Sequence, residues 1–166
     1  MPTHRYTLSK PLPRGIPSQE AISHLQNPLN VFALSDIIIS HKQLPQPEHP
    51  PGSIKAKTAS YEITDAVSYL PLGLWNSTVS VTMDFTNLTD GVTIVKHAPL
   101  GLTIREWWTV LEPDDSPGED WERAEKKVQL EAEMEGGRLV VMAFSAFMEG
   151  NHGVYLERMV AGMGEE

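Results

Sequence analysis

Hydrophobic and polar residues alternate along several stretches of the chain, which is the pattern of β-strands with one buried face. The clearest stretch covers residues 78–86, where Val79, Val81, Met83 and Phe85 are separated by threonine, serine and aspartate. Further strands are predicted, some of them more weakly, at 4–8, 34–44, 59–64, 92–98, 102–111 and 128–135. Short turn-forming segments rich in glycine, proline and aspartate separate several of these stretches, so we expect an antiparallel sheet.

Apolar residues at helical spacing predict a short helix after the first strand, with Ser18 as its N-cap and Pro28 at its end. A second helical turn is predicted at residues 28–32. Residues 138–163 predict one long helix, in which the glycine-containing segment 150–153 marks an interruption. The predicted order is a strand, two short helices, about six antiparallel strands and a long C-terminal helix, all in one α+β domain.

Amino-acid composition and charge exclude several classes of function. The chain has 166 residues, no cysteine and a net charge of −9. The negative charge argues against nucleic acid and anionic membranes as partners, and the lack of cysteine excludes disulfides and thiolate chemistry. The N-terminus has no apolar signal segment and no stretch reaches the ~18 apolar residues of a membrane helix, so a cytoplasmic protein is expected. Neither metal-ligand spacing nor a phosphate-binding loop is present, and we expect no cofactor.

One acidic residue stands at an apolar position. In residues 102–110 the even positions are leucine, isoleucine, Glu106, tryptophan and valine, and in a strand these side chains share one face. That face is the expected interior. A buried carboxylate is costly unless it is paired, hydrogen-bonded or protonated, so Glu106 requires a partner or a chemical role.

The two hairpins beside Glu106 suggest His97 as that partner. A three-residue loop at 89–91 pairs Met83 with His97, and a turn around residues 100–101 places His97 diagonally beside Glu106 on the same face. An imidazole and a carboxylate at that spacing can share a proton. The same register turns Lys96 to the solvent face. A two-residue Asp90-Gly91 turn would instead turn His97 outward, toward Asp84.

Several residues have both a structural and a functional interpretation. Glu106 and His97 form either a self-satisfied buried pair or a catalytic one. Tyr61 is either a core residue or a ligand contact, and Trp108 is either core or pocket wall. Trp75 either anchors a buried connection or covers a pocket. For His152, beside the expected helix interruption, a surface or capping position is the simpler interpretation.

The order of elements resembles the helix-grip fold of the START-like, or SRPBCC, superfamily of polyketide cyclases, plant allergens and lipid carriers. Three segments, 73–79, 90–92 and 98–102, together with Arg105-Glu106-Trp107-Trp108, resemble an uncharacterised fungal family of that superfamily. Some relatives are associated with polyketide gene clusters, which implies secondary metabolism and ring or lactone formation on a polyketide chain.

The resemblance implies a cavity between a curved sheet and the long helix, lined by apolar side chains and a few polar ones. We therefore expect an enzyme that binds a hydrophobic, oxygenated substrate and promotes cyclisation, lactone formation or dehydration. His97 and Glu106 would transfer protons, Glu106 with a raised pKa, and Tyr61 would hydrogen-bond a carbonyl oxygen. The residues expected to bind substrate are Trp75, Met83, Phe85, Trp108, Phe144 and Met148.

Two alternatives remain at the level of sequence. The first is a non-catalytic carrier or sensor of a hydrophobic molecule, which needs the cavity but no proton pair. The second is a dimerising scaffold with a collapsed cavity, because seven methionines and Trp107 on the outer face leave room for a homodimer. Enzyme and carrier are distinguished by whether Glu106 and His97 keep free lone pairs in the cavity.

Overall fold

The predicted architecture is confirmed by the computed structural model, which describes residues 2–45, 58–68, 76–113 and 125–164. A seven-stranded antiparallel sheet has the strand order β1-β7-β6-β5-β4-β3-β2. The elements, in chain order, are β1 (Thr3–Pro11), α1 (Ser18–Leu25), α2 (Pro28–Phe32), β2 (Ile38–Gln43), β3 (Thr58–Ser68), β4 (Asn76–Asn87), β5 (Gly91–Ala98), the 3₁₀ turn η2 (Pro99–Gly101), β6 (Leu102–Leu111), β7 (Lys127–Glu135) and α3 (Arg138–Gly162).

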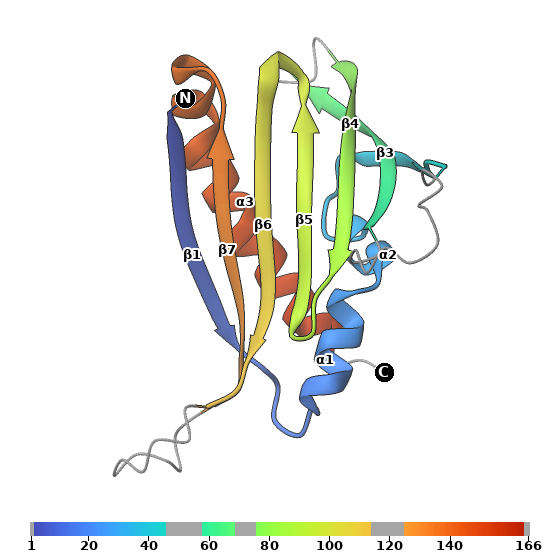
Figure 1. Ribbon diagram of the computed structural model, residues 1–166, viewed down its shortest axis with the longest axis vertical. Coiled ribbons are helices and arrows are strands. Elements are labelled where there is room, and N and C mark those ends of the chain that lie inside the picture. The colour runs from blue at the N-terminus through green and yellow to red at the C-terminus, as the bar shows by residue number, and fades with distance from the viewer. Residues whose placement is uncertain (1, 46–57, 69–75, 114–124, 165–166) are drawn as a thin grey trace, which may run out of the picture.

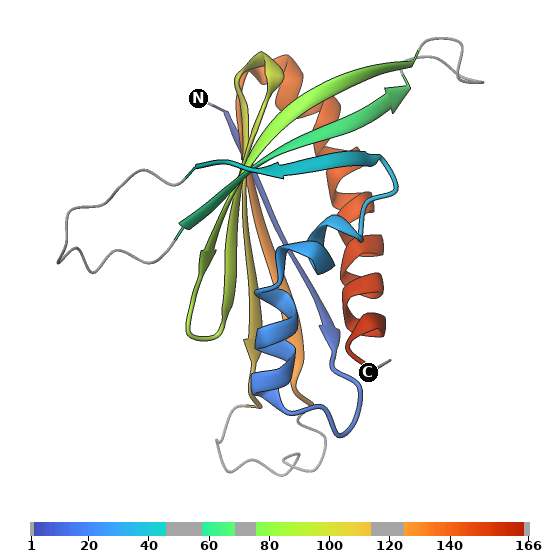
Figure 2. The same ribbon diagram turned by 90° about the vertical axis from the view of Figure 1, so that its right-hand side faces the viewer.

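The helices lie on one face of a strongly twisted sheet. Figure 1 looks through the sheet onto α3, which crosses behind it diagonally; α1 lies below β4 and β5, and α2 lies beside the lower end of β4. The perpendicular view shows β2, β3 and β4 curving toward the side that holds α3 (Figure 2). The sheet therefore curves partly around the long helix, and side chains of both contribute to the core between them.

The short helices begin where backbone chemistry allows. The Asn27 side chain accepts a hydrogen bond of 3.1 Å from the Leu29 N–H and so caps α2, and Pro28 occupies its first turn. The N-cap of α1 is Pro17, so the prediction for Ser18 is wrong by one position. The Ser18 hydroxyl instead donates to the carboxylate of Glu112, a contact distant in sequence.

The long helix α3 is continuous, so the predicted interruption at 150–153 is wrong. Its two mid-helix glycines keep helical backbone because packing of one face outweighs their weak helix propensity. That face buries five residues, namely Val141, His152, Leu156, Met159 and Val160.

The predicted register of the β4–β5 hairpin is wrong by one residue. The Leu88 N–H bonds to the Gly91 carbonyl at 2.9 Å, so the loop has two residues rather than three. Met83 therefore lies opposite Lys96, and His97 lies opposite Thr82. Because a shift of one residue exchanges the faces of a strand, Lys96 points inward and His97 outward.

A contact from α1 holds this turn. The side-chain amide of Gln26 donates to the carbonyl oxygens of Leu88 at 2.7 Å and Gly91 at 3.0 Å. Gly91 also packs so tightly that an added Cβ would lie 1.9 Å from the carbonyl oxygen of Trp108. The register thus depends on tertiary contacts that the hairpin's own sequence does not contain.

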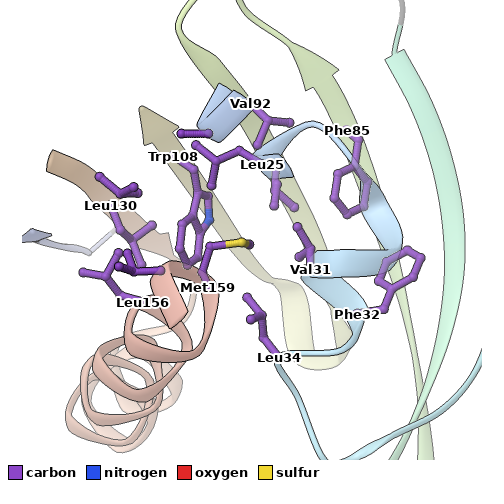
Figure 3. Close-up of a cluster of buried hydrophobic side chains, with 14 of the residues drawn as sticks. Leu25, Val31, Phe32, Leu34, Phe85, Val92, Trp108, Leu130, Leu156 and Met159 are labelled. Atoms are coloured by element: carbon purple, nitrogen blue, oxygen red, sulfur yellow. The ribbon is translucent and has the colours of Figure 1, made fainter. Parts of the chain in front are cut away.

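The main core fills the lower half of the space between sheet and helices. Figure 3 shows Trp108 of β6 against Met159 and Leu156 of α3, with Leu25 and Val31 of the short helices beside them. Trp108 is 1% exposed. Trp108 and Val31 of this packed layer also line the cavity described next.

Candidate functional site

A cavity of about 290 Å³ lies between the sheet, the first half of α3 and the segment that joins α2 to β2. Its wall is mainly apolar. The apolar residues that line it are Val31, Phe32, Leu34, Ile37, Ile38, Val79, Val81, Met83, Ala98, Pro99, Leu100, Leu102, Ile104, Trp108, Val140, Phe144, Phe147, Met148 and Tyr155. Four of these, Ile37, Leu100, Phe144 and Phe147, are also largely exposed, so they mark the opening.

The principal polar cluster of the cavity is centred on Glu106, which is 1% exposed. The ammonium group of Lys96, from the neighbouring strand β5, forms an ion pair with Oε1 of Glu106. The indole N–H of Trp108 donates to Oε2 at 3.0 Å. Lys96, Glu106 and Trp108 all line the cavity. The carboxylate is thus held by strong donors on both oxygens.

A second layer supports this cluster from α3. His152 is fully buried, and its Nε2 lies 3.1 Å from Oε1 of Glu106, within ion-pair distance but away from ideal hydrogen-bond geometry. Its Nδ1 lies 2.6 Å from the hydroxyl of Tyr6 on β1. When the Tyr6 hydroxyl donates to Nδ1, an N–H of the His152 ring lies on Nε2 and faces Glu106.

These contacts set the protonation of the cluster. Burial alone would raise the pKa of the Glu106 carboxyl, but Lys96 and His152 outweigh it and hold that pKa well below its ordinary value. The expected raised pKa of Glu106 is therefore wrong. Burial raises the pKa of the Tyr6 phenol, and the charges of Glu106 and Glu149 add to the shift. Glu106 is therefore an anion, and Tyr6 is a neutral donor.

The expected pairing of His97 with Glu106 is not formed. The His97 side chain is 51% exposed on the outer face of the sheet, and its Nε2 lies 3.4 Å from Asp84. The reason is the two-residue turn between β4 and β5, which places Lys96 where His97 was predicted. Glu106 does have a charged partner, but that partner is Lys96, the residue that precedes His97 in the sequence.

The other predicted site residues divide into two groups. Met83, Trp108, Phe144 and Met148 line the cavity, whereas Phe85 is 2% exposed and lies in the core beside it. Tyr61 packs edge-on against Phe32 and Phe85, with ring centroids 5.3 and 5.5 Å away, and is not among the lining residues. Trp75 lies outside the described residues.

Sequence reasoning missed Lys96, His152, Tyr6 and Asp65 as parts of the cavity cluster or its wall. For one of them, His152, the sequence contains a signal that could have identified it. His152 lies four residues after Met148 and four before Leu156, so helical spacing alone places it on the buried stripe of an unbroken helix. The expected helix interruption concealed this. Lys96 has no such signal, because its face depends on the hairpin register.

Among the described residues, no group of three or more histidine, aspartate or glutamate side chains is arranged to hold a metal ion. Within the same residues, no helix has the length and apolar character needed to span a membrane.

Comparison with known families identifies the family to which the chain belongs. A family model described as "Domain of unknown function (DUF7053)" matches residues 1–165. The chain belongs to this family. No curated protein matches the DUF7053 chain by sequence.

Solved structures share its fold at low sequence identity. The Zhui aromatase/cyclase from Streptomyces sp. R1128 superposes with a TM-score of 0.62 at 11% identity, over 98% of this chain and 94% of its own. Ara h 8.0201 superposes with a TM-score of 0.61 at 10% identity, over 99% and 100%. A hypothetical protein from Helicobacter pylori gives 0.55 at 12% identity, over 98% and 88%. These likenesses establish the helix-grip fold of the DUF7053 chain.

Proposed function

We propose that this protein binds a hydrophobic, carbonyl-bearing molecule of polyketide type in its cavity and promotes cyclisation or lactone formation. The observation that carries the proposal is the ammonium group of Lys96, which lines a predominantly apolar cavity and is held there by buried Glu106. An aromatase/cyclase has the same fold, and this likeness raises the expectation by analogy.

Lys96 is the residue suited to contact the reacting carbonyl. An ammonium group has three N–H donors, and the ion pair with Glu106 occupies one. The Lys96 side chain is 12% exposed, so its charge acts in a largely water-excluded site where electrostatic stabilisation is strong. Lys96 would polarise a ketone or thioester carbonyl and stabilise the oxyanion that forms when a nucleophilic oxygen or carbon attacks it.

Glu106, His152 and Tyr6 would be positioning residues. A carboxylate with a depressed pKa is a weak base, so Glu106 is better suited to orient Lys96 than to remove protons. His152 fixes Glu106 from behind, and Tyr6 fixes the ring of His152. His97 has no part in this proposal, since it lies on the outer face.

The test is the conversion of a linear triketide thioester of N-acetylcysteamine into a pyrone. The enol oxygen forms a bond to the thioester carbonyl carbon, the carbon–sulfur bond breaks, and the enol proton passes to the departing thiolate. The released thiol and the pyrone absorbance are both measured. We expect wild-type protein to accelerate this lactonisation and Lys96→Met to lose about 100-fold of the acceleration, as for the loss of an oxyanion donor. His97→Ala is the matched control and should behave as wild type.

Lys96→Met leaves Glu106 buried without its main partner, so folding must be controlled. The double variant Lys96→Met with Glu106→Gln removes both charges and should remain folded but inactive. Wild-type protein that binds the thioester without accelerating its lactonisation would contradict the catalytic proposal.

A non-catalytic carrier is the second candidate, and one observation favours it. Both oxygens of Glu106 are already engaged, by Lys96 and His152 on one side and Trp108 on the other. A saturated carboxylate suits a permanent binding wall. In that case Lys96→Met would lower affinity for carbonyl ligands, and no variant would change a reaction rate.

A further inference from the structure

Asp65 is the one acidic side chain on the cavity wall besides Glu106 among the described residues, and it is placed differently. It lies on β3, opposite Val79 of β4 and Ile38 of β2. Its Oδ1 is buried and has no hydrogen-bond donor within the described parts of the chain. Glu106 is held by three neighbouring side chains, whereas the carboxylate of Asp65 lines the cavity and has no partner among the described side chains.

An unpaired, partly buried carboxylate opposes folding. Burial raises the pKa of Asp65, and the charge of Lys96 across the cavity only partly offsets this. An asparagine or serine at this position would avoid the desolvation cost of a charge. A group kept at such a cost is expected to meet a donor from a ligand.

The register separates Asp65 from Lys96 along the cavity. Lys96 is paired with Met83 on β4, and Asp65 is paired with Val79 on the same strand, four positions away. Four residues of strand span about 13 Å. The cationic and anionic groups therefore lie at different depths of the cavity, with Asp65 toward the end formed by Val79 and η2.

We propose that Asp65 and Lys96 form a two-point polar contact for a neutral ligand that carries a carbonyl oxygen at one position and a hydroxyl group at the other. This inference rests on the proposed function and specifies its ligand class. Lys96 donates to the carbonyl oxygen, and the carboxylate of Asp65 accepts from the hydroxyl or enol O–H.

The same charges disfavour an anionic ligand. Among the described residues, Lys96 is the one cationic side chain on the cavity wall, and it is already paired with Glu106, so Asp65 adds a negative charge that has no ion-pair partner there. A fatty-acid carboxylate would compete with Glu106 for Lys96 and be repelled by Asp65. The cavity should therefore select hydroxylated ketones and esters against free acids of the same length.

The experiment measures displacement of the neutral fluorophore N-phenyl-1-naphthylamine from the intact protein by three matched aliphatic ligands. These are a methyl ester, the same ester with a terminal hydroxyl, and the corresponding free acid, each tested over a series of chain lengths. With wild-type protein, we expect the hydroxy ester at its best length to bind about tenfold more tightly than the plain ester. The free acid should bind most weakly.

Two variants and one control isolate the role of Asp65. Asp65→Ala should abolish the preference for the hydroxyl. Asp65→Asn, which keeps an acceptor and loses the charge, should keep part of that preference and bind the free acid more tightly than wild type. Glu62→Gln is the matched control, because Glu62 lies on the same strand with an exposed side chain, and it should behave as wild type.

The outcomes separate this inference from the proposed function. Wild-type protein that binds the fluorophore and the ester but does not prefer the hydroxy ester overturns the inference and leaves the cavity proposal intact. A preference that persists in Asp65→Ala also overturns it. Wild-type protein that binds neither the fluorophore nor any ester overturns the proposed function, and the inference with it.

Discussion

Buried charge is the feature that distinguishes this chain at the scale of single residues. Glu106 occupies an apolar strand face and is stable there because Lys96, Trp108 and His152 surround it. The anomaly itself was visible in the sequence, because one glutamate interrupts a strict alternation. Its partner was not, because the neighbouring positions Lys96 and His97 can each face inward, depending on a turn that the sequence alone leaves ambiguous.

Neutralising Glu106 should destabilise the protein. Glu106→Gln leaves the buried ammonium of Lys96 without its counter-charge, and breaking such a pair costs about 3 kcal/mol of unfolding free energy. Chemical denaturation monitored by tryptophan fluorescence measures the loss. The double variant Lys96→Met with Glu106→Gln should recover most of it. If the double variant is as unstable as Glu106→Gln, unpaired charge is not the cause.

The same chemical change at Asp65 should act in the opposite direction. The folded protein raises the pKa of Asp65, so its ionised form opposes folding at neutral pH. Asp65→Asn should therefore increase stability slightly, by less than about 1 kcal/mol because the group is partly solvated. A thermal melt beside Glu62→Gln measures the difference, and a lower melting temperature than the control would contradict this account.

At the scale of elements, the strands and helices follow from local sequence, and their register does not. Period-two alternation predicted the β4 and β6 strands and their buried faces, and helical spacing predicted α3. The two-residue turn between β4 and β5 is fixed by Gln26, the C-cap of α1, and by the close approach of Gly91 to β6. Both causes are tertiary contacts, so the sequence of the hairpin alone does not predict them.

Gly91 should be intolerant of any side chain. A Cβ there would lie 1.9 Å from the Trp108 carbonyl oxygen, which forces β5 and β6 apart. Gly91→Ala should cost roughly 3 kcal/mol or more, because two backbones must move in a packed sheet. The check is its denaturation midpoint, and near-wild-type stability would mean that this close approach is not required.

Gly150 should behave in the opposite way. It lies exposed in the middle of α3, and no atom of the described residues lies within 4 Å of a Cβ added there. Gly150→Ala should stabilise the helix by about 0.5–1 kcal/mol through backbone entropy. Amide hydrogen exchange in α3 should slow in proportion. Unchanged or faster exchange would show that the glycine is needed for more than helix continuity.

At the scale of the whole molecule, two buried groups limit the pH range of stability. The pKa of Glu106 is lowered on folding, so its contribution is present above the unfolded value of about 4.5 and is lost as the pH falls. The pKa of Tyr6 is raised, so its contribution is present below the unfolded value of 10.0 and is lost as the pH rises.

Melting temperatures measured across pH should therefore fall at both extremes. Glu106→Gln should flatten the acid side of the profile, and Tyr6→Phe should flatten the alkaline side. His97→Ala, which changes a partly exposed group on the outer face, should leave both sides unchanged. A Tyr6→Phe profile with the wild-type alkaline slope would place the cause elsewhere.

The pairing of β1 with β7 determines when the sheet can be completed during synthesis of the chain. Arg5 and Glu133, which form an ion pair across these two strands, are 128 residues apart. At usual rates of translation, the second strand leaves the ribosome on the order of ten seconds after the first. Through that interval β1 has no sheet neighbour and α3, which packs on it, does not yet exist. Because α3 also supplies part of the cavity wall, the nascent chain cannot close its cavity before α3 has been synthesised.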